Sequence, residues 1–218
     1  MIITIPDPAL VLLIGPAGAG KSTFAAAHFQ PVEIVSSDHL RGLLSNDPAD
    51  QSASAEAFRI LVLMVSGRLK RRLTTVIDAT SLLAANRSRY RAIAARHGVP
   101  VIAVAFDLPV ATFFARNRER SGRVVSEEVV ERQVDQMVRA LTSLPAEHYA
   151  ALFVLKAPET AGIVIDRVVS ERRWDPRDSS EIGHSALVVK GPGGIGLNSL
   201  LGSDEGTHDG PERGQCCN

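Results

Sequence analysis

The sequence contains little that would indicate a disulfide framework, a zinc site or a membrane span. Its two cysteines are the adjacent pair Cys216 and Cys217, and neighbouring cysteines rarely bridge each other or hold zinc alone. The histidines before residue 150 lack the spacing of metal ligands. No apolar run approaches the roughly 20 residues of a membrane span, and the first residues lack the charged region of a signal peptide. We therefore expect a soluble cytoplasmic protein.

The chain also lacks an excess of charge of either sign, since 24 basic residues balance 24 acidic ones. The balance is uneven along the chain, however. Residues 1–170 carry 19 Lys and Arg against 16 Asp and Glu, whereas residues 171–218 carry 5 against 8. Only four of the basic residues are lysines. The overall charge therefore does not indicate a nucleic-acid binder, although the first part of the chain is mildly basic and rich in arginine.

Short apolar runs alternate with helix-like segments from residue 9 to about residue 155. About five runs are typical of parallel strands that are buried on both faces, and they lie at residues 10–14, 32–35, 75–77, 101–106 and 152–155. The intervening segments are predicted to be helices, at residues 22–28, 54–72, 84–97, 110–120 and from 126 onward. Residues 163–170 fit either a strand or a helix. This alternation predicts an α/β fold, a parallel sheet with helices on both faces.

The composition changes towards the end of the chain. Residues 175–218 are rich in Gly, Ser, Asp and Pro, which is typical of disordered segments. We therefore expect one folded domain over residues 1–171 and a low-complexity, disordered tail over residues 172–218. The stretch 187–196 resembles a strand followed by a glycine loop, but Leu197 stands where a phosphate-binding lysine would be needed. It therefore does not predict a second nucleotide site.

The most specific motif follows the first apolar run and matches G-x-x-x-x-G-K-[ST] at every required position. It consists of Gly15, Pro16, Ala17, Gly18, Ala19, Gly20, Lys21 and Ser22, with Thr23 next. Its glycines allow backbone N–H groups to form an anion cradle at a helix start. Lys21 is predicted to reach the β- and γ-phosphates of ATP, and the Ser22 hydroxyl to bind Mg²⁺. The motif predicts a nucleotide site, and with the alternation of strands and helices it predicts a parallel sheet of the P-loop NTPase type.

A second motif, Ser36-Ser37-Asp38-His39-Leu40-Arg41, follows the second apolar run. An aspartate at the end of a strand can accept the proton of an attacking hydroxyl. Arg41 lies about one helical turn further on and could hold an anionic substrate group. The alternative is that Asp38 only caps a short helix and Arg41 lies on the surface.

Four arginines follow the fourth apolar run within eight residues, in the segment from Arg116 to Arg123. Arg116 and Arg120 are spaced so that they share a helix face, and Arg123 follows after Gly122. Kinases of the P-loop class close a basic lid over ATP, so we expect an arginine-rich lid here. The alternative is an ordinary solvated helix face.

The third apolar run ends at Asp78-Ala79-Thr80. Because the carboxyl ends of parallel strands meet at one edge of a sheet, Asp78 and Asp107 should gather there with Gly15 and Asp38. Asp78 and Thr80 are therefore candidates to line the acceptor or metal site. The alternative is a simple turn that closes the strand, which is the better interpretation of Asp107 because a proline follows it.

Taken together, these motifs resemble the 5′-hydroxyl polynucleotide kinases. The P-loop, the segment 36–41, Val76-Ile-Asp-Ala-Thr80 and the Arg116–Arg120 lid occur in the same order and at similar intervals. The resemblance is strongest to the kinase module of bacterial polynucleotide kinase-phosphatases, which act in RNA end-healing. It covers about residues 8–171, including the stretches 47–51 and 133–137.

The resemblance implies a role for each matching position. Lys21 and Ser22 would serve ATP and Mg²⁺, Asp38 would be the general base on a 5′-hydroxyl, and Arg41 would contact the acceptor end. The remaining residues would form the lid and the acceptor wall, and these are Arg116, Arg120, Arg123, Asp78 and Thr80. The chain departs from the family at Ser81, where asparagine is common. It also continues into a low-complexity tail instead of a metallophosphatase module.

The sequence leaves three hypotheses for the function. The first is ATP-dependent phosphorylation of a 5′-hydroxyl end of RNA or DNA. The second is a small-molecule hydroxyl kinase of the same P-loop class, which the zero net charge and the small basic lid favour slightly. The third is a nucleotide-binding protein without catalytic activity. The sequence does not specify an oligomeric state.

Overall fold

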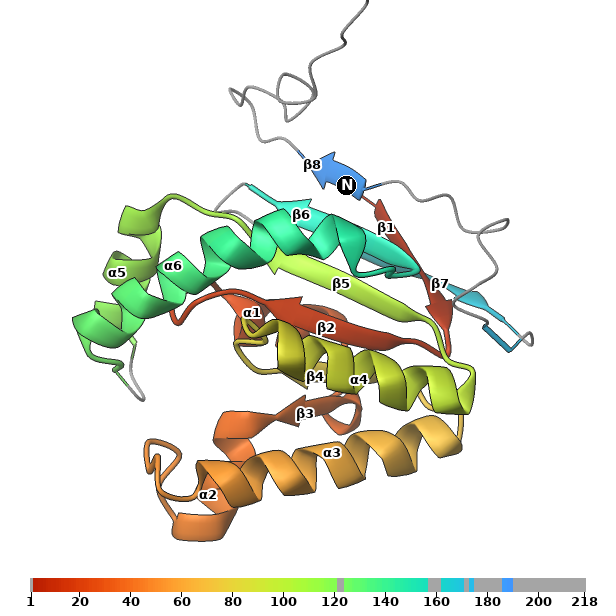
Figure 1. Ribbon diagram of the computed structural model, residues 1–218, viewed down its shortest axis with the longest axis horizontal. Coiled ribbons are helices and arrows are strands. Elements are labelled where there is room, and N and C mark those ends of the chain that lie inside the picture. The colour runs from red at the N-terminus through yellow and green to blue at the C-terminus, as the bar shows by residue number, and fades with distance from the viewer. Residues whose placement is uncertain (1, 121–123, 157–161, 171–172, 175–185, 190–218) are drawn as a thin grey trace, which may run out of the picture.

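The computed structural model describes residues 2–120, 124–156, 162–170, 173–174 and 186–189 (Figure 1). Within these residues, one parallel sheet has the strand order β3-β4-β2-β5-β6-β8. Its strands are β2 (Leu10–Ile14), β3 (Ile34–Ser36), β4 (Thr75–Asp78), β5 (Val101–Phe106), β6 (Ala151–Leu155) and β8 (Ala186–Val189). The predicted α/β sheet of the P-loop NTPase type is confirmed, and β8 extends it beyond the five strands expected.

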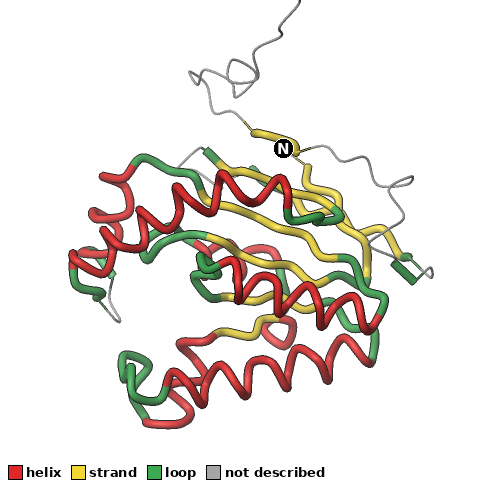
Figure 2. Tube along the Cα trace, in the orientation of Figure 1, coloured by secondary structure: helices red, strands yellow, loops and turns green. Residues whose placement is uncertain are grey.

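Helices cover both faces of this sheet, as Figure 2 shows in red against the yellow strands. They are α1 (Lys21–His28), α2 (Ser37–Ser45), α3 (Ser54–Lys70), α4 (Ala84–His97), α5 (Val110–Arg118) and α6 (Glu127–Ser143). Two short 3-10 helices, η1 (Pro31–Glu33) and η2 (Leu144–Ala146), complete the set in the described part of the chain. Apolar residues of α3 and α4 join the core on one face, and those of α1 and α5 join it on the other.

The central strand β2 shows why its sequence is a continuous apolar run. Successive side chains of a strand point to opposite faces of the sheet. Leu10, Leu12 and Ile14 therefore pack on the side of α3 and α4, while Val11 and Leu13 pack on the side of α1. All five are buried. A strand covered on both faces has no polar position, and its hydrogen bonds to β4 and β5 fix the point at which it ends.

Some predicted boundaries differ from the structure. The run at residues 32–35 begins as the 3-10 helix η1, with Pro31 at its first position, and only Ile34–Ser36 form the strand. The helix predicted over residues 110–120 ends at Arg118, because Glu119 is already the C-cap. The ambiguous segment at residues 163–170 is a strand, β7 (Val164–Val169).

A small second sheet was not predicted. It pairs β1 (Ile2–Asp7) with β7 in parallel, with Ile2 opposite Val164. In β1 the buried residues Ile3 and Ile5 alternate with exposed ones, a weak period-2 signal in a short strand that contains a proline. Its partner lies more than 150 residues away in the sequence, so the pairing left no local signal.

The predicted division between residues 1–171 and 172–218 stays a prediction, because most of the second segment lies outside the described residues. Strand β8 belongs to that segment, and it pairs with β6 in the register Leu152 to Ala186. Cys216 and Cys217 also lie outside the described residues. In the described part of the chain, every helix is too short or too polar to cross a membrane.

Candidate active site

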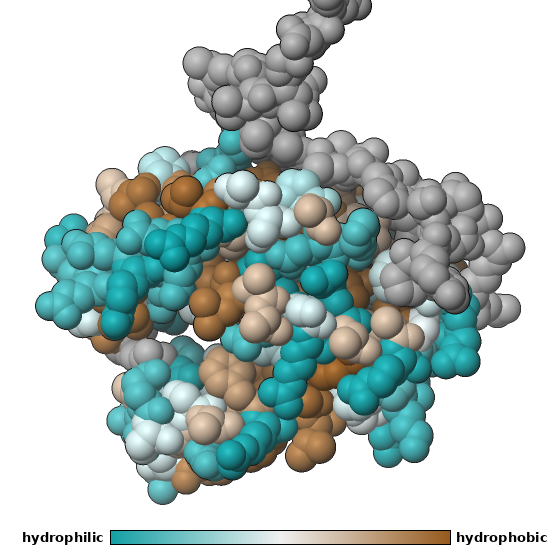
Figure 3. All heavy atoms as spheres, viewed as in Figure 1, coloured by the Kyte–Doolittle hydropathy of each residue, from teal (hydrophilic) through white to brown (hydrophobic). Residues whose placement is uncertain are grey.

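A cavity of about 680 Å³ lies at the carboxyl ends of the central strands, a volume within the usual range of small-molecule sites. Its lining includes residues of α2 and α3 and residues of α5 and α6, and Figure 1 shows α5 and α6 on the side of the fold opposite α2. The space-filling view shows mostly hydrophilic side chains around this end of the molecule (Figure 3). Predicted residues that line the cavity are Ala17, Gly18, Ala19, Gly20, Lys21, Ser22, Thr23, Asp38, Arg41, Asp78, Thr80, Arg116 and Arg120.

The phosphate loop joins β2 to α1 and depends on two glycines with left-handed backbones. Gly18 has a φ of 79° and Gly20 has a φ of 89°, a region that other residues rarely adopt. A Cβ atom at Gly18 would lie 2.3 Å from the carbonyl oxygen of Phe113 on α5. The loop is therefore packed directly under the lid helix, and glycine is required at its tip.

Lys21 begins α1 and is almost fully buried, with 9% of its surface exposed. Its Nζ donates to the carbonyl oxygens of Gly15, at 2.9 Å, and Pro16, at 2.8 Å. Burial lowers the pKa of Lys21 to about 8, with Arg120 acting in the same direction and Asp78 and Asp38 acting against it. A buried ammonium group among backbone N–H groups is suited to bind phosphate oxygens.

The residues near Ser22 fit a magnesium ion that arrives with a nucleotide. Ser22 follows Lys21 in the first turn of α1, and the carboxylates of Asp78 and Asp38 line the same cavity. In the described residues no cluster of three His, Cys, Asp or Glu side chains could hold a metal by itself. Mg²⁺ is commonly held by one or two protein oxygens together with substrate phosphates, and this donor set matches that pattern.

Asp38 does not cap α2, contrary to the alternative considered for it. The N-cap is Ser36, whose Oγ accepts a hydrogen bond from His39 N at 3.4 Å. Asp38 instead accepts a short hydrogen bond from Arg41 Nη2. The Arg41 side chain is 4% exposed, whereas that of Asp38 is 40% exposed. Arg41 Nε also donates to Pro48 O at 3.0 Å, so Arg41 fixes the Asp38 carboxylate at the cavity wall.

The loop after β4 forms another part of the wall and is connected to the phosphate loop. Thr80 O accepts a hydrogen bond from Gly15 N at 3.0 Å. Asp78, the last residue of β4, is nearly buried, and Thr80 is partly exposed to the cavity. Ser81 follows with a φ of 49°, a left-handed conformation that asparagine adopts more readily than serine.

The lid segment enters the cavity at the end of α5. Arg116 lies on the helix, and its guanidinium group would lie 3.3 Å from a Cβ atom at Gly20. Arg120 lies beyond the end of the helix, so the predicted shared helix face is wrong. Both arginines nevertheless line the cavity. Arg123 lies outside the described residues.

Asn117 fixes the base of this lid. Its side chain is 1% exposed, and it joins the end of α5 to Val125, shortly before α6 begins. Its Nδ2 donates to Val125 O at 2.7 Å, and its Oδ1 accepts from Val125 N at 3.1 Å. Asp107, expected near the same sheet edge, is not among the cavity-lining residues and pairs with Lys156 at 3.5 Å.

Several cavity-lining residues were not predicted as site residues, and they are Ser37, Gln51, Ser54, Phe58, Ala79, Glu119, Val125 and Gln133. Gln133 on α6 accepts a hydrogen bond from Ala17 N at 2.7 Å. This contact joins positions 116 residues apart and leaves no local sequence signal. Gln51 and Gln133 lie in the two stretches that resembled the kinase family, which was the only indication of their position.

Comparisons with known proteins agree with this geometry. A family model described as an AAA domain matches residues 10–144, which include the phosphate loop, Asp38, Asp78 and the lid. No curated protein matches the sequence.

Solved structures with the same fold are distant in sequence. A chain of the Pnkp1/Rnl/Hen1 RNA repair complex superposes with a TM-score of 0.55 and 23% identity, over 64% of this chain and 47% of that one. AvrRxo1-ORF1:-ORF2 with ATP gives a TM-score of 0.51 and 16% identity, over 68% of this chain and 55% of that one. Shikimate kinase from Acinetobacter baumannii gives a TM-score of 0.44 and 19% identity, over 71% of this chain and 86% of that one. This similarity is too low to support a conclusion about function. The chain thus spans about half the length of the first two chains.

Proposed function

The chain belongs to the AAA domain family, matched over residues 10–144, and from that premise we propose that it transfers the γ-phosphate of ATP to a 5′-hydroxyl end of RNA or DNA. The observation that carries the proposal is that one cavity holds both halves of such a reaction. Lys21 and Ser22, which would hold the nucleotide, line the same cavity as Asp38 and Arg41, which would serve the acceptor. A protein that only binds nucleotide does not need the second pair.

On the nucleotide side, the backbone N–H groups of the phosphate loop and Lys21 Nζ hold the β- and γ-phosphates. Lys21 exchanges its two carbonyl acceptors for phosphate oxygens, which are stronger partners for an ammonium group. Arg116 and Arg120 approach from the lid and stabilise charge on the transferred phosphoryl group. When Mg²⁺ is bound with ATP at Ser22 and Asp78, it neutralises charge on the phosphates.

On the acceptor side, Asp38 acts as the general base. It accepts the proton of the 5′-hydroxyl while the hydroxyl oxygen forms a bond to the γ-phosphorus. The bond from the γ-phosphorus to the bridging oxygen breaks, and ADP leaves with that oxygen. Arg41 orients the carboxylate, and it contacts the phosphate of the acceptor end through its remaining donors.

The zero net charge of the chain favours one second candidate, a kinase for a neutral small-molecule hydroxyl. Both candidates use Lys21, Asp38 and the lid in the same way, so variants of these residues do not separate them. They differ in the acceptor. Binding of a nucleic-acid end releases counterions and weakens steeply with salt, whereas binding of a neutral small molecule does not.

The experiment is phosphate transfer from γ-labelled ATP to a short oligonucleotide with a 5′-hydroxyl, in RNA and DNA forms. The matched control is the same oligonucleotide with a 5′-phosphate, which has no acceptor group. We expect labelling of the hydroxyl form alone, with a KM for the oligonucleotide that rises between 50 and 200 mM salt (about the range over which such contacts weaken). Labelling of a sugar or nucleoside but of neither oligonucleotide would contradict the proposal.

A further inference from the structure

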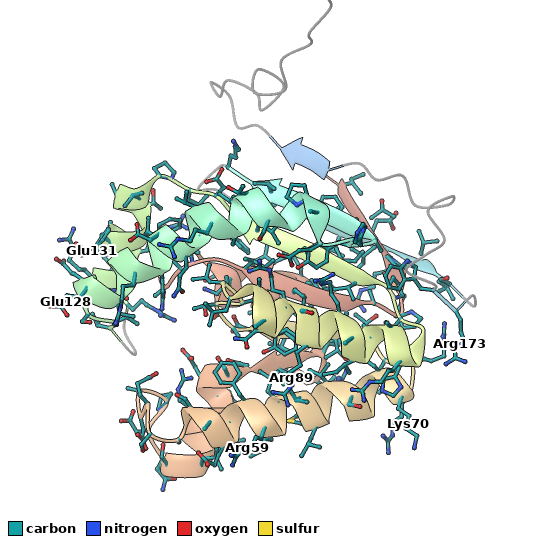
Figure 4. The ribbon with its side chains drawn as sticks, in the orientation of Figure 1. Arg59, Lys70, Arg89, Glu128, Glu131 and Arg173 are labelled. Carbon is teal, nitrogen blue, oxygen red and sulfur yellow. The ribbon has the colours of Figure 1, made fainter. Side chains whose placement is uncertain are left out.

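Behind the acceptor wall, α4 carries a fully buried arginine that the proposed chemistry does not use. Arg87 is 1% exposed and is among the largest fully buried side chains of the described residues. Buried guanidinium groups are rare unless each donor is satisfied. Arg89, two positions along the same helix, points outward to solvent (Figure 4). The two arginines therefore offer a matched pair, one buried and one exposed.

One edge of the Arg87 guanidinium group holds the loop that follows β4. Its Nη1 donates to Ser81 O at 3.1 Å and to Leu82 O at 2.6 Å. This is the loop that begins with Asp78 and Thr80 on the cavity wall, and Thr80 O in turn accepts from Gly15 N. Arg87 thus holds this loop one and two residues beyond Thr80, the residue that contacts the phosphate loop.

The other edge of Arg87 is held by Glu147. Arg87 Nε donates to both carboxylate oxygens, at 2.9 and 3.2 Å, and Nη2 donates to Ser143 Oγ at 3.0 Å. Tyr149 also donates to Glu147, at 2.8 Å. Burial opposes ionisation of Glu147, but the hydrogen bonds from Arg87 and Tyr149 outweigh it, so its pKa lies below its ordinary value. Glu147 is therefore a fixed anion that sets the direction of the guanidinium group.

The loop needs such support because of its backbone. Ser81 has a positive φ, which is unfavourable for any residue with a Cβ atom and persists only where the surroundings impose it. Its hydroxyl is buried and makes no hydrogen bond to the other described residues. The Ser81 side chain therefore does not stabilise the turn. The turn is stabilised by the hydrogen bond that Arg87 donates to the Ser81 carbonyl oxygen.

We propose that Arg87, oriented by Glu147, is a positioning residue that holds the loop of residues 79–83 so that Asp78 and Thr80 keep their places on the acceptor wall. This inference rests on the proposed kinase function for its kinetic consequences. Displacement of a reacting group by about 1 Å can lower the rate about 100-fold. Arg87 acts through the loop and touches neither ATP nor the acceptor.

The test compares Arg87→Lys with Arg89→Lys, the same change at the exposed position. Lysine keeps the charge but does not span from Glu147 to two carbonyl groups at once. We expect Arg87→Lys to lower kcat/KM for the 5′-hydroxyl oligonucleotide about 10- to 100-fold. The Kd for ATP, measured without Mg²⁺ so that Asp78 is not part of the binding site, should change less than about 2-fold. Arg89→Lys should match the wild type. Assays run at a temperature at which circular dichroism shows both variants folded.

A milder variant covers the case in which Arg87→Lys does not fold. Glu147→Gln keeps the shape of the side chain and one acceptor oxygen, so it loosens the guanidinium group without removing it. We expect Glu147→Gln to lower kcat/KM for the acceptor as well, but by a smaller factor than Arg87→Lys. Equal changes in the acceptor and ATP parameters, or no change in either, would show that the pair only stabilises the fold.

Amide hydrogen exchange separates this inference from the kinase proposal. The Gly15 amide bonds to Thr80 O, so its exchange should accelerate in Arg87→Lys and stay unchanged in Arg89→Lys. If the wild type transfers no phosphate to oligonucleotides, the kinase proposal fails, and this measurement still tests the positioning role. Unchanged exchange at Gly15 and over residues 79–83 in Arg87→Lys would overturn the role of Arg87.

Discussion

The two sides of the cavity are built in different ways. The phosphate-binding part of the proposed nucleotide side comes from one contiguous segment, residues 17–23, in which backbone geometry and one buried lysine make the binding surface. The acceptor side comes from α2, α3 and the loop after β4, and it is held by side chains such as Arg41 and Arg87. A contiguous motif can be recognised in a sequence, whereas an assembly of distant side chains becomes visible only in the fold.

The largest effect is expected from a substitution that disturbs the backbone of the phosphate loop. We expect Gly18→Ala to abolish measurable ATP binding, because the new Cβ atom would lie 2.3 Å from Phe113 O and the φ of 79° disfavours alanine. The measurement is titration of ATP by calorimetry. ATP binding of near wild-type affinity would show that the tip of the loop is not fixed as described.

Gly67→Ala is the matched control for that variant. Gly67 lies in α3, and a Cβ atom there would make only an ordinary contact with Arg71 at 3.8 Å. Alanine is favoured over glycine in a helix interior by about 1 kcal/mol. The control should therefore bind ATP normally and unfold at the same or a higher temperature.

A substitution in the lid should have the next largest effect. It separates the contribution of the lid to catalysis from the binding of ATP by the phosphate loop. Arg116→Ala should lower kcat by about 100-fold or more, because it removes a cation from the transferred phosphoryl group. Arg59→Ala, at an exposed site on α3 that points away from the molecule (Figure 4), is the control and should leave kcat unchanged. A normal kcat in Arg116→Ala would show that Arg116 does not stabilise the transferred phosphoryl group.

A smaller effect is expected at acidic pH. An ion pair between Glu33 and Arg167 anchors the start of β3, the strand that leads to Asp38. Glu33 accepts hydrogen bonds from Arg167, both at 2.7 Å. These bonds hold the pKa of Glu33 below its ordinary value of 4.5, although burial acts against them. The pair therefore stabilises the fold fully above pH 4.5, and this stability is lost as the pH falls through the lower pKa of the folded state.

Denaturant unfolding of Glu33→Gln between pH 7 and pH 3 measures this contribution. At pH 7 the variant should be less stable than the wild type by about 1 kcal/mol, since the pair is partly exposed. The difference should shrink as the pH falls below 4.5. A difference that is constant with pH would exclude a charged pair as the anchor.

The smallest expected effect concerns the strained turn of the acceptor side. Ser81→Gly should raise the free energy of unfolding by about 0.5 kcal/mol, because relief of a left-handed residue gains about 1–2 kcal/mol and glycine loses about 0.5–1 in the unfolded chain. Ser81→Ala, which removes the hydroxyl but keeps Cβ, should not be stabilised in this way. Equal stabilities of the two variants in urea would exclude backbone strain at this position.

Sequence patterns predicted the central sheet well, because a strand buried on both faces requires a continuous apolar run. The P-loop is an equally local signal, and the structure places Ala17 to Thr23 on the cavity as expected. Asp38 and Asp78 were also brought to the same cavity, because each lies at or just after the end of a parallel strand at one edge of the sheet. The lid arginines Arg116 and Arg120 reach the cavity from the end of α5. The proposed roles of these residues stay predictions.

Contacts between distant segments could not be predicted. Strand β1 pairs with β7 across the whole domain, and Gln133 reaches Ala17 from α6. Arg87 and Glu147 are 60 residues apart, and neither belongs to a motif. Each of these contacts depends on packing that only the folded chain creates. The sequence also placed Arg120 on a helix that ends before it, because a helix end without a strong stop signal is poorly defined by periodicity.

The central claim, that one cavity joins an ATP site to a base for a hydroxyl acceptor, is tested most directly with Asp38→Asn. Asparagine keeps the shape of the side chain and an oxygen for Arg41 but is unable to take up the proton. Labelled phosphate transfer to a 5′-hydroxyl oligonucleotide and the Kd for ATP are measured side by side for the variant and the wild type. The account predicts transfer by the wild type, a fall of about 100-fold or more in the variant, and an unchanged Kd for ATP. Transfer at the wild-type rate by Asp38→Asn would contradict it.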